Sequence, residues 1–190
     1  MTASVVAMHD DSLTIPSDLL GPLTLPSREI VRFPGGLYGF PECRTFALAP
    51  AAREGVYWLQ SADYSALSFL LVDPFVYFAD YHIDLDDADL PRLGTNDPQH
   101  LLVLAIVTMP STTGAPSTAN LHAPLLFNIR DRHAHQSIRP NDGYSIREPF
   151  SIDQPREPFS IDPPREPFSI DPPRVPFSID PPREPLVVGA

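Results

Sequence analysis

The sequence has no lysine and only one cysteine, and both shortages narrow the classes of protein to which it can belong. All 13 basic residues are arginines, against 24 acidic residues, and the formal net charge is -11. Nucleic-acid binding depends on clustered Lys and Arg that contact phosphates, so this charge balance argues against direct nucleic-acid binding and favours a basic protein partner. Cys43 has no second cysteine to pair with, which excludes an internal disulfide and predicts a reducing, cytoplasmic location.

Long hydrophobic runs are also lacking. The apolar run at residues 101–109, LLVLAIVTM, falls well short of the roughly 20 residues that span a bilayer. The N-terminus, MTASVVAMHDDSL, lacks the positively charged segment that precedes the apolar core of a signal peptide. We therefore expect no contact with a membrane.

Proline, by contrast, is abundant, with 25 residues in a chain of 190. From Arg147 onward a nine-residue unit, REPFSIDPP with small variations, repeats along the chain. Such units carry too few apolar groups to offset the entropy of ordering them, although polyproline II would place every Phe on the same side because its three residues per turn divide nine. We expect a flexible leader at residues 1–27, one domain at residues 28–147, and a disordered or polyproline II tail at residues 148–190.

The strongest structural signal lies in residues 67–81, LSFLLVDPFVYFADY. Residues 67–72 form an apolar run with the length of a buried strand. The run ends at Asp73 and Pro74, where the missing N–H of proline and its restriction of the preceding residue predict a turn. A second apolar run, residues 75–78, then continues into alternating apolar and polar residues, as in a strand with one solvated face. This stretch is predicted to be the centre of a β core.

Short apolar segments separated by turn signals recur along the chain. Three glycines and two prolines at residues 34–41, PGGLYGFP, predict a compact turn, and Trp58 is predicted to be buried between strands. Eight or so short strands with at most one short helix predict an all-β antiparallel barrel or sandwich. The further strands are expected at residues 29–33, 44–48, 56–60, 101–109 and 125–129.

An acidic segment at residues 84–90 could suggest calcium binding, but its spacing does not fit. An EF-hand loop that began at Asp84 would need an oxygen ligand at position 88, a glycine at position 89 and a glutamate at position 95. The sequence has Ala88, Asp89 and Thr95 at these positions. We expect instead the solvated start of a short helix, with carboxylates near its amide-rich N-terminus.

Evidence for catalysis or metal binding is weak. His133 and His135 form an HxH pair, but no cysteine or third histidine clusters with them, and a polar turn is the simpler interpretation. Cys43 could act as a nucleophile, yet no nucleophile motif surrounds it. The histidines that could serve as its base are His82, His100 and His122. The residues thus indicate no catalytic group, metal or cofactor, while a small β-barrel enzyme or ligand-binding protein that uses Asp or His residues stays open as the alternative.

Three polar residues could serve either the fold or a partner. Asp73 could cap the amides of its own loop in an Asx turn, or it could present a carboxylate at the rim of a protein-binding surface. Asn120 has the same two options, and Tyr81 combines an aromatic body with a polar tip, which suits either an interface or a barrel. The Phe-Ser-Ile-Asp repeats could likewise be docking motifs of a structural protein.

The sequence also contains an ordered series of motifs. They are FPGGLYGFP at residues 33–41, WLQS at 58–61, FLLVDPF at 69–75 with Asp80 and Tyr81, IVT at 106–108, and NLHAP at 120–124 with Gln136. This series resembles the FliW flagellar assembly factor family. Their order and spacing match the family over residues 29–147, whereas the leader and the repeats depart from it.

The resemblance implies an all-β, barrel-like protein that works without catalysis in the cytoplasm of flagellated bacteria. We expect the protein to be a monomer. Members of the family bind flagellin and also CsrA, a dimeric RNA-binding regulator, which they prevent from repressing flagellin mRNA. Flagellin that accumulates captures the assembly factor and frees CsrA. The residues expected to contact partners are Asp73, Pro74, Phe75, Tyr81, Asn120, Leu121 and Pro124.

Overall fold

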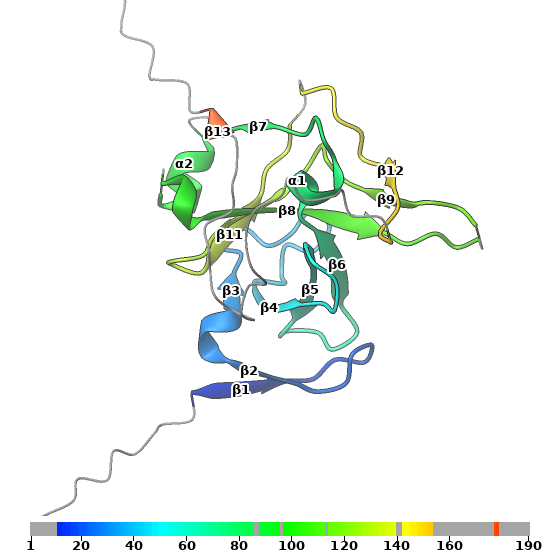
Figure 1. The fold of residues 1–190 in the computed structure, drawn as a ribbon. Coiled ribbons are helices and arrows are strands. Elements are labelled where there is room, and N and C mark those ends of the chain that lie inside the picture. Colours follow the sequence, from blue (N-terminus) through cyan, green and yellow to red (C-terminus); the bar gives the residue numbers. More distant parts are fainter. Residues whose placement is uncertain are drawn as a thin grey trace, which may run out of the picture.

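The computed structural model describes residues 11–85, 88–95, 97–112, 114–139, 142–153 and 177–178. Seven strands close into a barrel, because β8 pairs with β10 as well as with β6, and β11 returns to β3 (Figure 1). All pairings in this ring are antiparallel except that of β11 with β3, where His133 lies opposite Arg32. The barrel strands are β3 (Ile30–Arg32), β4 (Thr45–Pro50), β5 (Val56–Ser61), β6 (Ser68–Val72), β8 (Leu101–Thr108), β10 (Leu125–Asn128) and β11 (His133–Gln136).

Smaller elements surround the barrel. The hairpin of β1 (Ser12–Ile15) and β2 (Leu23–Pro26) lies at the bottom in Figure 1, and β9 (Ser117–Ala119) and β12 (Glu148–Phe150) extend the sheet beyond β8. The short β7 (Ile83–Asp84) pairs in parallel with β13 (Phe177–Ser178). The helical elements are η1 (Ser27–Glu29), α1 (Pro74–Tyr77), α2 (Asp89–Leu93) and η2 (Pro98–His100).

Strand β8 separates two hydrophobic cores. Leu104 faces the barrel interior, which also contains Phe33, Phe46 and Phe127. The ring centroid of Phe33 lies 5.2 Å from that of Phe46 and 5.7 Å from that of Phe127, both in edge-to-face contact. The alternate residues of β8 face a second core, which we call the outer core. The segment from α1 to α2 and the strands β9 and β12 cover it. The residues of β8 that face the outer core are Leu101, Val103, Ala105 and Val107. Burial on both faces explains why the run LLVLAIV has no polar alternation.

The structure confirms the prediction of an all-β barrel with small helices, and it refines several elements. There are two short α-helices among the described residues, one more than predicted. Residues 75–78 lie in and just after α1, not in a strand, because Pro74 suits the first helical turn and the Asp73 carboxylate accepts a hydrogen bond from the Phe75 N–H at 2.9 Å. Trp58 is half-buried and not fully buried.

The predicted leader and the predicted tail both contain strands. Residues 12–26, within the predicted leader, form the β1–β2 hairpin, and residues 148–150, within the predicted tail, form β12. The rest of the predicted tail lies outside the described residues, apart from Phe177–Ser178. The expectation of a disordered or polyproline II tail therefore stays a prediction.

The turn at residues 34–41 depends on Gly36. Its φ is +69°, and a Cβ at this position would lie 2.6 Å from the Cα and the carbonyl oxygen of Pro41. Leu37 and Phe40 bridge the turn, with the Phe40 N–H donating to the Leu37 carbonyl at 2.8 Å. Leu37 is thereby held in the interior core.

Gly36→Ala is expected to lower the free energy of unfolding by about 2 kcal/mol, because an L side chain is strained at positive φ and here also meets backbone. Urea unfolding measures this change. Gly35→Ala is the matched control, since a Cβ at Gly35 meets nothing within 4 Å and its φ is not positive. Equal losses for the two variants would contradict this account of the turn.

Candidate functional site

The structure gathers most of the predicted partner-binding residues at the end of the barrel that α1 covers. Asp73 and Pro74 begin α1, and the Phe75 ring lies 5.3 Å from that of Tyr81. The Tyr81 ring in turn lies 4.9 Å from that of Tyr144. The next residue after Tyr144, Ser145, accepts hydrogen bonds from the N–H groups of Leu121 and His122. We call this region, residues 73–81 with 120–121 and 144–145, the α1 end.

Burial divides the seven predicted residues into two groups. Tyr81 is 5% exposed and Leu121 is 2% exposed, and both belong to the outer core, while Pro74 and Pro124 are also buried. Burial raises the pKa of Tyr81 far above its ordinary value because it disfavours the phenolate. These four side chains therefore pack inside the domain. Tyr81 does not lie at the exposed rim of a binding surface. The other three, Asp73, Phe75 and Asn120, are half-buried, and their contact with a partner stays a prediction.

The polar side chains of the α1 end stabilise its loops. The Asp73 carboxylate caps α1 and its backbone N–H donates to the Gly55 carbonyl at 2.7 Å, which ties the helix to the β4–β5 turn. The Asn120 Oδ1 accepts from the Ala123 N–H at 3.0 Å. Both residues thus make the local Asx-type hydrogen bonds that their sequence context predicts.

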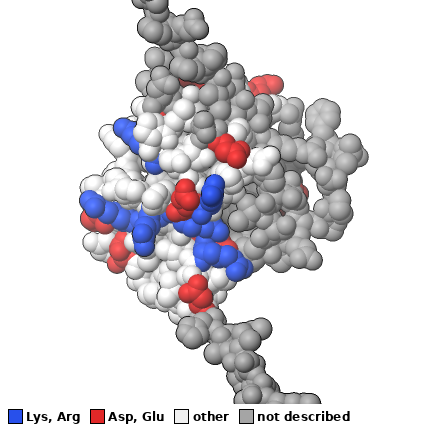
Figure 2. All heavy atoms as spheres, turned by 90° about the vertical axis from the view of Figure 1, so that its left-hand side faces the viewer, with Lys and Arg blue, Asp and Glu red and all other residues white. Residues whose placement is uncertain are grey.

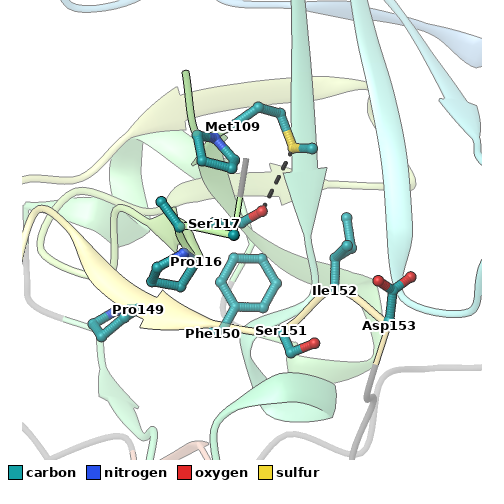
Figure 3. A pocket seen from close by; sticks show the side chains of 11 residues that line it. Met109, Pro116, Ser117, Pro149, Phe150, Ser151, Ile152 and Asp153 are labelled. Atoms are coloured by element: carbon teal, nitrogen blue, oxygen red, sulfur yellow. Dashed lines mark hydrogen bonds between the residues drawn. The ribbon is translucent and has the colours of Figure 1, made fainter. Parts of the chain in front are cut away.

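An open groove runs beside the α1 end, between the loop that joins β8 to β9 and the segment that contains β12 (Figure 3). Its volume is about 610 Å³. Met109, which is 55% exposed, Pro116 and Phe150 give it apolar walls, and Ser117 and Asp153 supply polar groups. None of the candidate catalytic residues Asp73, His82 and His122 lines it. The groove is open to solvent, and its lining combines apolar and polar groups.

A buried ionic cluster fixes the other side of the outer core. Asp89, in the first turn of α2, is 2% exposed, and its carboxylate lies 2.9 Å from His135 Nε2 and 2.5 Å from Arg139 Nη2. Arg139 also donates to the Asp84 carbonyl. The prediction of a helix start at the acidic segment is confirmed, but Asp89 is not solvated. The sequence alone did not predict this cluster, because His135 and Arg139 lie 46 and 50 positions after Asp89.

Comparison with known proteins identifies the family of this chain. The family model described as FliW protein matches residues 14–150, which include every barrel strand as well as β9 and β12. The chain belongs to the FliW family. The flagellar assembly factor FliW of Treponema denticola is 37% identical over 131 residues, 69% of this chain and 88% of the relative. That of Treponema pallidum is 40% identical over 124 residues, 65% of this chain and 82% of the relative.

A solved structure agrees with this assignment. A crystal structure of the flagellar assembly factor FliW matches with a TM-score of 0.65 and 34% identity, covering 72% of this chain and 96% of that one. The match to the FliW family model begins within β1 and ends at the last residue of β12. The first repeat unit therefore begins inside the FliW domain, and the later units follow it.

Three residues of this FliW chain that could carry chemistry, Cys43, His82 and His135, are engaged in the fold. Cys43 is buried in the interior core, and burial raises the pKa of its thiol, which makes it a poor nucleophile. His82 Nδ1 is hydrogen-bonded to the Tyr144 hydroxyl at 2.9 Å, and His135 is bound to Asp89. Within the described ranges, no group of three or more His, Cys, Asp or Glu side chains could hold a metal ion.

The helices of this FliW chain are short. In the part of the chain that the structure describes, none is both long and apolar enough to cross a membrane.

Asp73→Ala is expected to lower the free energy of unfolding by about 1 kcal/mol, because α1 loses its N-cap. Asp73→Asn should retain most of the stability, since an amide oxygen can accept the same bond. Chemical denaturation distinguishes the two variants. An Asn variant as unstable as the Ala variant would show that the negative charge matters and the cap does not.

Asp89→Ala is expected to cost about 3 kcal/mol, because it leaves the buried guanidinium of Arg139 without its ionic partner. Asp84→Ala is the matched control, since Asp84 is exposed and contributes its carbonyl to the cluster. Equilibrium unfolding in urea measures both. A loss below about 1 kcal/mol for Asp89→Ala would contradict a structural role for the cluster.

Proposed function

We propose that this FliW chain is a non-enzymatic, cytoplasmic regulator that binds flagellin and the translational regulator CsrA. When flagellin is scarce, the chain holds CsrA and prevents it from repressing flagellin mRNA. When flagellin accumulates, it captures the chain and frees CsrA. The observation that carries this proposal is the match of the complete barrel to the FliW family.

The charge of the chain supports a basic protein partner in preference to RNA. The net charge of -11 steers a basic RNA-binding protein towards the chain and places negative potential where RNA phosphates would otherwise approach. On the face shown in Figure 2, arginines run across the middle with carboxylates among them. Such a mixed surface differs from the continuous basic stripe of nucleic-acid-binding proteins.

The mechanism requires no chemical step. Two partners that bind the same chain with unfavourable coupling weaken each other's affinity by the same factor, whether their surfaces overlap or not. A closed barrel with two packed cores suits this task, because interfaces that are formed in advance lose little entropy on binding. The groove beside the α1 end, with exposed Met109 on its wall, is the surface at which we place flagellin.

The test mixes the purified chain with flagellin and CsrA from the same organism and measures binding by calorimetry. Both proteins should bind at micromolar concentration or tighter, and prior addition of flagellin should weaken CsrA binding. The association rate with CsrA should fall as salt rises, because steering by opposite charges is screened. Failure of both proteins to bind would overturn the proposal.

The position of the flagellin contact is tested separately with Met109→Glu, which places a charge on the groove wall and should weaken flagellin binding at least tenfold. Tyr64→Glu is the matched control, because Tyr64 is equally exposed, at 53% against 55%, and does not line the groove. If flagellin bound both variants as tightly as the unmodified chain, the contact would lie elsewhere while the function could still hold.

A further inference from the structure

Two of the repeats that follow the FliW domain are exact copies of a segment that packs against β9, α1 and Arg53. The first unit, residues 147–153, reads REPFSID, and its residues Glu148–Phe150 form β12 against β9. The same seven letters recur at residues 156–162 and 165–171. A docking site for this sequence therefore exists within the chain, and the chain carries more than one segment that matches it.

The contacts of the first unit show what the site recognises. Phe150 is 9% exposed, and its ring centroid lies 5.4 Å from those of Tyr77 and Phe78. Ile152 packs against the outer core. Arg53 donates to the Ile152 carbonyl and pairs with the Asp153 carboxylate. The site thus binds a strand backbone, a phenylalanine, an isoleucine two positions later and then an aspartate.

Each of these features is identical in the next two units. Phe159, Ile161 and Asp162 have the spacing of Phe150, Ile152 and Asp153. Residues Phe168, Ile170 and Asp171 repeat it once more. Since the seven residues are the same in all three units, contacts made by these residues cannot distinguish one unit from another. The units differ in their flanking residues and in their connection to the barrel.

We propose that the surface formed by β9, α1 and Arg53 is an exchangeable docking site, in which residues 156–162 or 165–171 can replace residues 147–153. The barrel holds the chain up to Ser145, whose carbonyl accepts from the Leu121 and His122 N–H groups. Docking of the second unit in place of the first lengthens the connection from Ser145 by nine residues. The entropy of loop closure grows only with the logarithm of loop length, so the second unit is disfavoured by about tenfold and not excluded. The first unit is the main occupant, and the later units are intramolecular replacements.

The experiment compares the melting temperatures of three variants of the full chain. Phe150→Ala removes the anchor of the first unit, Phe159→Ala with Phe168→Ala removes those of the next two, and a triple variant removes all three. The same substitution is used at each position, so the double variant is the matched control for the single one. Phe177 is left unchanged because β13 already pairs with β7.

Exchange predicts strong coupling between the substitutions. The double variant should have the melting temperature of the unmodified chain. Phe150→Ala should melt about 4 °C below the unmodified chain, because a less favoured unit docks. The triple variant should melt about 10 °C below the unmodified chain. A triple variant that fails to fold while Phe150→Ala folds also supports exchange. If Phe150→Ala were as unstable as the triple variant, or if neither differed from the unmodified chain, exchange would be excluded.

Light scattering on Phe150→Ala separates exchange within one chain from exchange between chains. Replacement by a segment of the same molecule predicts a monomeric mass and a melting temperature that do not change with protein concentration. A mass that rises towards a dimer on concentration would show that a unit of a second copy occupies the site, and would overturn the proposal as stated.

Discussion

The burial of β8 on both faces is the constraint on which the rest of the structure depends. Leu104 belongs to the barrel interior, while Val103 and Ala105 belong to the outer core. A shift of one residue in the pairing of β8 with β6 or β10 would exchange the two faces and disrupt both cores at once. The closed ring of strands therefore has one register that satisfies both layers.

The outer core explains why the elements outside the ring are where they are. Once one face of β8 is apolar and lies outside the barrel, other segments must cover it, because an exposed strip of such residues would be unfavourable. The chain supplies Tyr81 and Leu121 from the α1 end, Leu93 from α2, and Phe150 from β12. The Asp89 cluster links α2 to His135 of β11 and to Arg139. Much of the surface available for a partner thus consists of elements whose inner sides complete this second core.

The sequence predicts the strands well and the covering layer less well. The unbroken apolar run of β8 and the glycines of the 34–41 turn are strong local signals, and each has a local cause. The failure at residues 75–78 has a local cause too, because aromatic and β-branched residues favour a strand while Asp73 and Pro74 provide a helix start that prevails. The Asp89 cluster and the docking of Phe150 depend on contacts between distant segments, and no local pattern reveals them. For the same reason, the motifs did not indicate which of the seven predicted partner residues are buried and which are half-buried.

Hydrogen–deuterium exchange of the full chain, alone and with flagellin, tests the central claim most directly: a FliW barrel that binds its partner beside the α1 end. We predict slower exchange in the loop of residues 109–117 on addition of flagellin, and no change in β8, whose amides are already protected in the two cores. Unchanged exchange in this loop, with protection of another face or of none, would contradict the account.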